Sequence, residues 1–91
     1  MSGKYQKMTP ALKNEVLRIL NRGVSAEEMA AMPPNAHHMV ANKKASLFCD
    51  KLIDGRMTFE QVFEIARGEL DDPRVEAALF IENVVTGNYD K

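Results

Sequence analysis

Hydrophobic residues recur at helical spacing along the whole chain, and no segment shows the strict alternation that is typical of a β-strand. The longest helical pattern spans residues 39–53, where a run of hydrophobic side chains shares one arc of a helix: Ala41, Ala45, Phe48, Cys49, Leu52 and Ile53. Lys43, Ser46 and Asp50 fall on the opposite side. The pattern predicts a central helix with one face toward a hydrophobic core.

Capping residues and helix breakers divide the chain into five predicted helices. A polar side chain that can accept from the backbone stands at each predicted start, and glycine or proline stands beyond most predicted ends. Short connections between these helices favour an all-α fold, a compact irregular bundle of about five short helices. The predicted N-caps are Thr9, Ser25, Asn35, Thr58 and Asp72, and the predicted breaks are Gly23, Pro33-Pro34, Gly55 and Gly87.

The length of 91 residues predicts a single domain, 1–91, with one hydrophobic core. The polar segments 1–8 and 88–91 are expected to be frayed. No hydrophobic run approaches the roughly 20 residues of a membrane span, and the first residues lack the hydrophobic stretch of a secretory signal. We therefore expect a cytoplasmic protein that does not bind a membrane. Cys49 lies on the hydrophobic arc, which predicts a buried and inert thiol.

The fourth and fifth helices differ in their hydrophobic patterns. In the fourth helix, the hydrophobic residues share one stripe, formed by Phe59, Val62, Phe63, Ala66 and Leu70. In the fifth, most hydrophobic residues share a wide arc, whereas Val75 and Leu79 point the other way. Either this helix is central and buried nearly all round, or Val75 and Leu79 form an exposed ridge. Because a terminal helix more often packs at the edge of a small bundle, we expect the ridge, in contact with a second copy or with another helix.

The net charge of −1 conceals two oppositely charged halves. Residues 1–56 hold nine Lys or Arg and five Asp or Glu, a balance of +4, whereas residues 57–91 hold three and eight, a balance of −5. Two interpretations are open: the halves attract each other as they pack, or their fields steer self-association into a homo-oligomer.

The sequence lacks the local motifs of the common catalytic chemistries. No Cys-x-x-Cys, phosphate-binding loop, serine-hydrolase motif or dinucleotide-binding glycine motif is present. His37 and His38 are adjacent, and neither has a second His or Cys four residues along a helix to complete a metal pair. We therefore expect no metal, no cofactor and no enzymatic activity, which leaves binding as the mode of action.

The favoured hypothesis is a small regulatory or adaptor protein that binds another protein through helical surfaces. Two hydrophobic residues of the central helix, Val40 and Leu47, lie outside its core-facing arc and beside lysines. The fifth helix adds another such pair, Val75 and Leu79. Clustered methionines near Pro33-Pro34 either fill gaps in the core or line an adaptable peptide-binding surface. The methionines are Met29, Met32 and Met39; the predicted partner-binding residues are Val40, Lys43, Lys44, Leu47, Lys51, Val75 and Leu79.

Residues 25–48 also resemble a helix-turn-helix, with a short capped helix, a turn and a second helix rich in polar groups. Pro34 falls where the turn usually has glycine, and only two lysines and no arginine lie between residues 30 and 50. DNA binding is therefore the alternative, ranked below protein binding. The resemblance implies groove and phosphate contacts from His37, His38, Asn42, Lys43 and Lys44.

Overall fold

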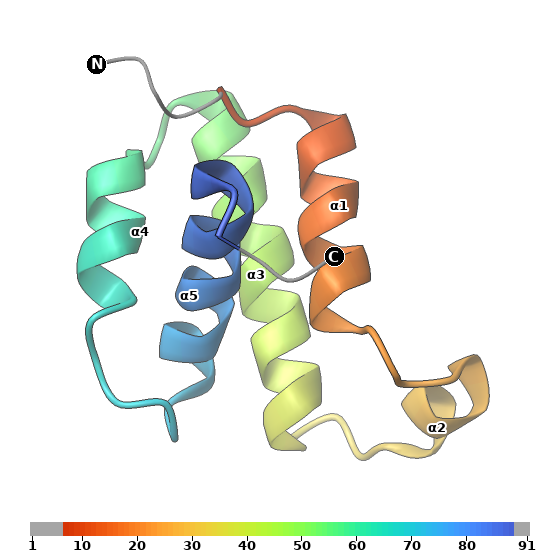
Figure 1. Cartoon of the computed structure of the whole chain (residues 1–91). Coiled ribbons are helices and arrows are strands. Elements are labelled where there is room, and N and C mark those ends of the chain that lie inside the picture. The colour runs from red at the N-terminus through yellow and green to blue at the C-terminus, as the bar shows by residue number, and fades with distance from the viewer. Residues whose placement is uncertain (1–6, 89–91) are drawn as a thin grey trace.

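The computed structural model describes residues 7–88, and within this range the chain forms five helices and no strand. The predicted all-α fold is confirmed. Of the two segments predicted to be frayed, residues 1–6 and 89–91 lie outside the described residues. The helices are α1 (Pro10–Leu20), α2 (Ala26–Ala31), α3 (His37–Asp54), α4 (Phe59–Ile65) and α5 (Pro73–Thr86) (Figure 1).

Four of the five predicted N-caps are confirmed. The Thr9 hydroxyl accepts a hydrogen bond from the backbone N–H of Leu12, and the Asp72 carboxylate accepts one from the backbone N–H of Arg74. Ser25 and Thr58 each form a complete capping box, with the side chains of Glu28 and Gln61 respectively. These caps satisfy backbone donors that the first helical turn leaves unpaired.

The prediction that Asn35 caps α3 is wrong. The backbone N–H of Ala36 donates to the Pro33 carbonyl at 3.0 Å, which closes a turn around Asn35. Ala36 is consequently the N-cap, in extended conformation, and no side chain caps the helix. At the other end Gly55 has φ +80°, the left-handed conformation that ends a helix and that glycine adopts without strain.

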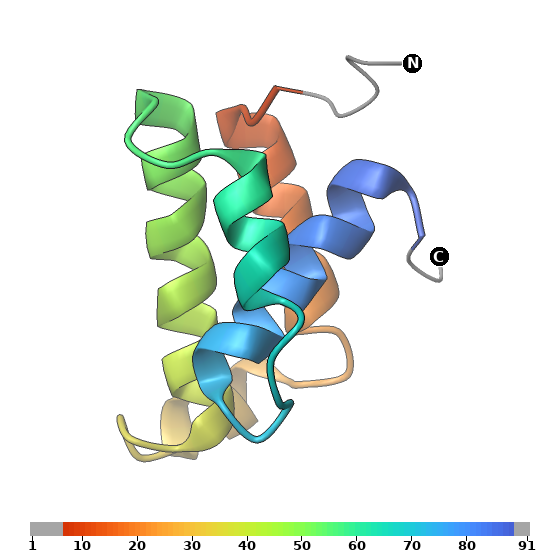
Figure 2. The ribbon, with the colours of Figure 1, turned by 90° about the vertical axis from the view of Figure 1, so that its left-hand side faces the viewer.

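Helix α5 lies at the centre of the bundle. It packs against α1, α3 and α4, while α1 also packs against α3 (Figure 1). Figure 2 shows α4 lying over α5 on the side away from α1. The expectation that the last helix packs at the edge is therefore wrong, because three helices surround it.

The core is drawn from all helices except α2. It includes the predicted arc of α3, with Ala41, Ala45 and Cys49 fully buried. Met8, which was predicted to lie in a frayed segment, is only 2% exposed and belongs to the core. The hydrophobic core therefore includes a residue that precedes the Thr9 cap of α1.

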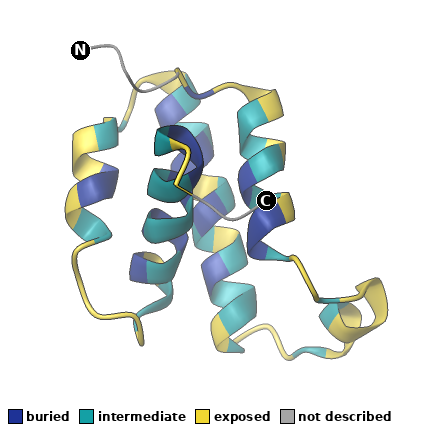
Figure 3. Cartoon of the chain, viewed as in Figure 1, coloured by how far each residue is buried: buried dark blue, intermediate teal, exposed yellow. Residues whose placement is uncertain are grey.

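The segment around α2 projects from the bundle. No residue of α2 is buried, and Figure 3 shows this segment as mostly exposed, beside the closely packed α1, α3 and α5. Its capping box and short length make it a local structure, stabilised by its own hydrogen bonds rather than by a core. None of the described helices is both long enough and hydrophobic enough to cross a membrane.

Candidate functional site

The outward face of α3 carries the predicted partner-binding residues of that helix. Positions 40, 44, 47 and 51 follow one another at helical spacing, and position 43 lies beside them. Leu47 is 40% exposed, which makes it one of only two large hydrophobic side chains that are exposed among residues 7–88. We call this surface the α3 lysine face; it consists of Val40, Lys43, Lys44, Leu47 and Lys51.

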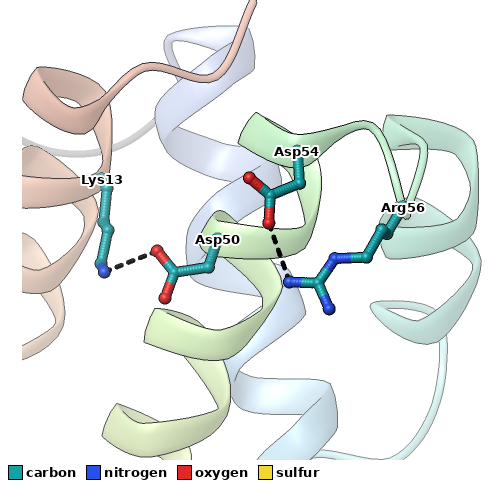
Figure 4. A network of polar contacts seen from close by, with 4 residues as sticks. All are labelled: Lys13, Asp50, Asp54 and Arg56. Atoms are coloured by element: carbon teal, nitrogen blue, oxygen red, sulfur yellow. Dashed lines mark hydrogen bonds and ion pairs between the residues drawn. The ribbon is translucent and has the colours of Figure 1, made fainter.

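The lysines of this face have no acidic neighbour that neutralises them. Lys43, Lys44 and Lys51 make no side-chain hydrogen bond or ion pair with any residue in the described part of the chain. The two acidic residues of α3 are already engaged: Asp50 accepts from Lys13 Nζ at 2.7 Å, and Asp54 accepts from Arg56 Nη2 at 2.9 Å (Figure 4). The face therefore keeps an uncompensated positive charge around an exposed leucine.

The partial burial of the lysine side chains bears on what this face can bind. Lys44 and Lys51 are half-buried, and so is Val40, which lies one turn before Lys44. A lysine can lay its methylene stem along apolar surface while its ammonium group remains in water. A ligand that replaces water at this surface meets both an apolar floor and a positive rim.

The residues proposed for DNA contact split into two groups that face different ways. His38 Nε2 donates to Asn21 Oδ1 at 2.8 Å, and Asn21 Nδ2 donates to Asn42 Oδ1 at 3.3 Å. His37 Nε2 lies 2.5 Å from Glu76 Oε1 on α5. These three side chains of α3 thus attach its first half to α1 and α5, whereas the lysines point outward.

The geometry of α2 also departs from a helix-turn-helix. In that motif the first helix supports the second by packing on it, but no residue of α2 is buried. The methionines around Pro33-Pro34 are all half-buried, so they neither join the core cluster nor stand free on the surface. The resemblance to a helix-turn-helix therefore extends to the order of helices and caps, and not to their packing.

The second predicted partner-binding pair is not an exposed ridge. Val75 is 5% exposed and Leu79 is half-buried. The α4–α5 connection passes directly over Val75, because a Cβ added at Gly68 would lie 2.8 Å from Val75 Cγ2. The alternative in which α5 is central and buried nearly all round is the one that the structure supports.

A second exposed hydrophobic site, at Leu70, was not predicted from the sequence. The hydrophobic pattern placed Leu70 on the stripe of α4, but α4 ends at Ile65, and Leu70 lies in the following loop with 59% of its surface exposed. Glu69 and Asp71 flank it, and neither carboxylate makes a hydrogen bond or ion pair with a described residue. Gly68 is the sequence signal for this site: it predicts either the end of the helix or a glycine tolerated inside it, and α4 in fact ends three residues before it. We call Glu69, Leu70 and Asp71 the acidic loop.

The described residues offer no three clustered His, Cys, Asp or Glu side chains that could hold a metal ion. Burial raises the pKa of the Cys49 thiol to about 12, against a smaller opposing effect of Lys13, so this thiol stays protonated at neutral pH. Cys49 thus lies in the core as predicted. Comparison of the chain with protein-family models, curated proteins and solved structures gives no match.

Proposed function

We propose that this protein is a small regulatory or adaptor protein, and that it binds an acidic, partly hydrophobic segment of another protein on the α3 lysine face. The observation that carries the proposal is the cluster of three unpaired lysines around the exposed Leu47. Charge complementarity favours an acidic partner, since opposite charges across an interface steer encounter and select the partner. The apolar floor at Leu47 and Val40 favours a partner that also presents a hydrophobic side chain.

Protein binding is favoured over DNA binding by the polar contacts of α3. A DNA reader needs side chains that are free to reach base edges. His37, His38 and Asn42 are instead held by Glu76 and Asn21. The lysines alone supply a charge-dependent contact without sequence specificity.

The experiment is a pull-down from a native lysate, with wild type and two variants as bait. Lys43→Glu/Lys44→Glu reverses the charge of the face. Lys7→Glu/Arg67→Glu makes the same change in net charge at exposed positions outside the face. We expect wild type and the control variant to capture the same proteins, and the face variant to lose them, with all three proteins equally folded by circular dichroism.

Half of each lysate is treated with nuclease to separate the two modes of binding. Capture that survives nuclease and depends on the face supports the proposal. Capture that disappears with nuclease shows instead that the lysines bind nucleic acid. In that case the amount of nucleic acid captured by wild type should fall steeply as the salt concentration rises. If the face variant and the control variant behave alike, the lysines are ordinary solvated surface and the proposal is overturned.

A further inference from the structure

The two large hydrophobic side chains that are exposed among residues 7–88 lie in surroundings of opposite charge. Leu47 is 40% exposed and lies among Lys43, Lys44 and Lys51, whereas Leu70 is 59% exposed and lies between two carboxylates. None of these lysines or carboxylates has an ion-pair partner among the described residues. An exposed leucine with unpaired charges around it is what each half of a complementary contact would present.

We infer that the α3 lysine face receives the acidic loop of a second copy of this chain. In this contact Leu70 packs on Leu47 and Val40, while the carboxylates of Glu69 and Asp71 approach the lysine ammonium groups. The inference rests on the proposed function, because it names an occupant of the same face. The acidic loop also shows the chemistry that a different partner must have to compete for that face.

The structure supports a second copy rather than an intramolecular contact. The acidic loop follows α4 and folds over Val75 through Gly68, and its carboxylates make no ion pair with α3 of the same chain. Leu70 accordingly remains exposed in the isolated molecule. The charges of the two halves of the sequence agree with this contact, since the lysine face belongs to the positive half and the acidic loop to the negative half.

The size of the contact sets its expected strength. One leucine on each side with a few rim charges covers less than the roughly 1,200 Å² of a stable interface, so the association is weak and transient. We expect it to become measurable by sedimentation at protein concentrations approaching about 1 mM. Because the Debye length shrinks from about 30 Å at 0.01 M salt to about 3 Å at 1 M, association should weaken as salt is added.

Charge exchange between two variants tests the contact directly. The face-reversed variant is Lys43→Glu/Lys44→Glu, and the loop-reversed variant is Glu69→Lys/Asp71→Lys. In each variant alone, the face and the loop carry charges of the same sign and repel each other. We expect the association constant to fall at least about tenfold, a penalty of about 1.4 kcal/mol. Mixed together, the basic face of the loop-reversed variant meets the acidic loop of the face-reversed one, and the reversed pair attract as well.

The decisive result is therefore recovery of the higher mass in the mixture, at the salt concentration where neither variant associates alone. Leu70→Ser is the matched control for the hydrophobic part: it should weaken association without any change in charge. Wild type that stays monomeric throughout the concentration range, or a mixture that associates no better than its components, overturns the inference.

The same variants separate this inference from the proposed function. If a second copy occupies the face, the loop-reversed variant loses self-association but still captures the proteins that wild type captures from a lysate, because its face is intact. The face-reversed variant loses both. A monomeric wild type whose lysate partners depend on Lys43 and Lys44 would overturn the second copy and leave the proposed function standing.

Discussion

Lys13 Nζ lies 2.7 Å from Asp50 Oδ1 and joins α1 to α3 (Figure 4). The pair covers the edge of the core where Cys49 is fully buried. The side chain of Lys13 is 23% exposed and that of Asp50 is 49% exposed, so water screens the carboxylate more than the ammonium group. The pair engages Asp50, which lies two turns along α3 from Lys43 on the same side of the helix, so this carboxylate does not pair with the lysines of the α3 lysine face.

We expect Lys13→Met to lower the free energy of unfolding by about 0.2–1 kcal/mol, because partly exposed ion pairs contribute within this range. Urea denaturation at low and high salt measures the loss, and the difference between wild type and variant should shrink as salt rises. Lys43→Met is the control, since that lysine has no partner and its loss should leave stability within about 0.5 kcal/mol of wild type. Equal effects of the two substitutions would mean that the pair contributes nothing.

The start of α4 gives a second prediction. Thr58→Ala removes the hydroxyl that accepts from the Gln61 backbone N–H, and we expect a loss of about 0.5–2 kcal/mol in the free energy of unfolding. Asn35→Ala should change it by less than about 0.5 kcal/mol, since Asn35 lies outside the N-cap position of α3. Chemical denaturation of both variants measures the contrast, and a larger loss for Asn35→Ala would move the start of α3.

Helix starts could be predicted from the sequence because a cap depends on residues within one turn of each other. The capping-box hydrogen bonds of Ser25 with Glu28, and of Thr58 with Gln61, each join residues only three positions apart. Asn35 failed as a cap because the turn closed by Ala36 and Pro33 places it one residue too early. Asn is a residue type that often caps helices, but the backbone turn places Ala36 at the N-cap position instead.

The position of α5 could not be predicted, since it depends on contacts distant in sequence. Its hydrophobic residues point in two directions, which fits either a central helix or an edge helix with a ridge. Burial of Val75 depends on Gly68 lying against it, and no periodicity within α5 reports that contact. The same loop carries Leu70 away from the stripe of α4 and makes it exposed. The α3 residues of the candidate site were predictable, because they lie off one continuous buried arc.

Val75→Glu therefore tests the centre of the fold. A carboxylate at this 5% exposed position would be buried without a partner, which costs several kcal/mol out of a total stability of about 5–15 kcal/mol. We expect a large fall in the melting temperature, or failure to fold, measured by circular dichroism. Leu70→Glu is the matched control, because that side chain is 59% exposed and the same charge there should leave the melting temperature nearly unchanged. Similar melting curves for the two variants would place Val75 on the surface.

The Cys49 thiol provides the last prediction. Burial raises its pKa from 9.0 to about 12, so the folded protein at about pH 8 holds roughly 10³-fold less thiolate than the unfolded chain. A thiol reagent should accordingly react slowly with the native protein and rapidly in denaturant, and equal rates would contradict burial.

The raised pKa of Cys49 also sets the sign of the pH dependence of stability. Between pH 9.0 and about 12 the folded state keeps a proton that the unfolded state has lost, so stability present below pH 9.0 declines across this window. Cys49→Ala lacks this group, and the slope of unfolding free energy against pH should therefore be less negative for Cys49→Ala than for wild type.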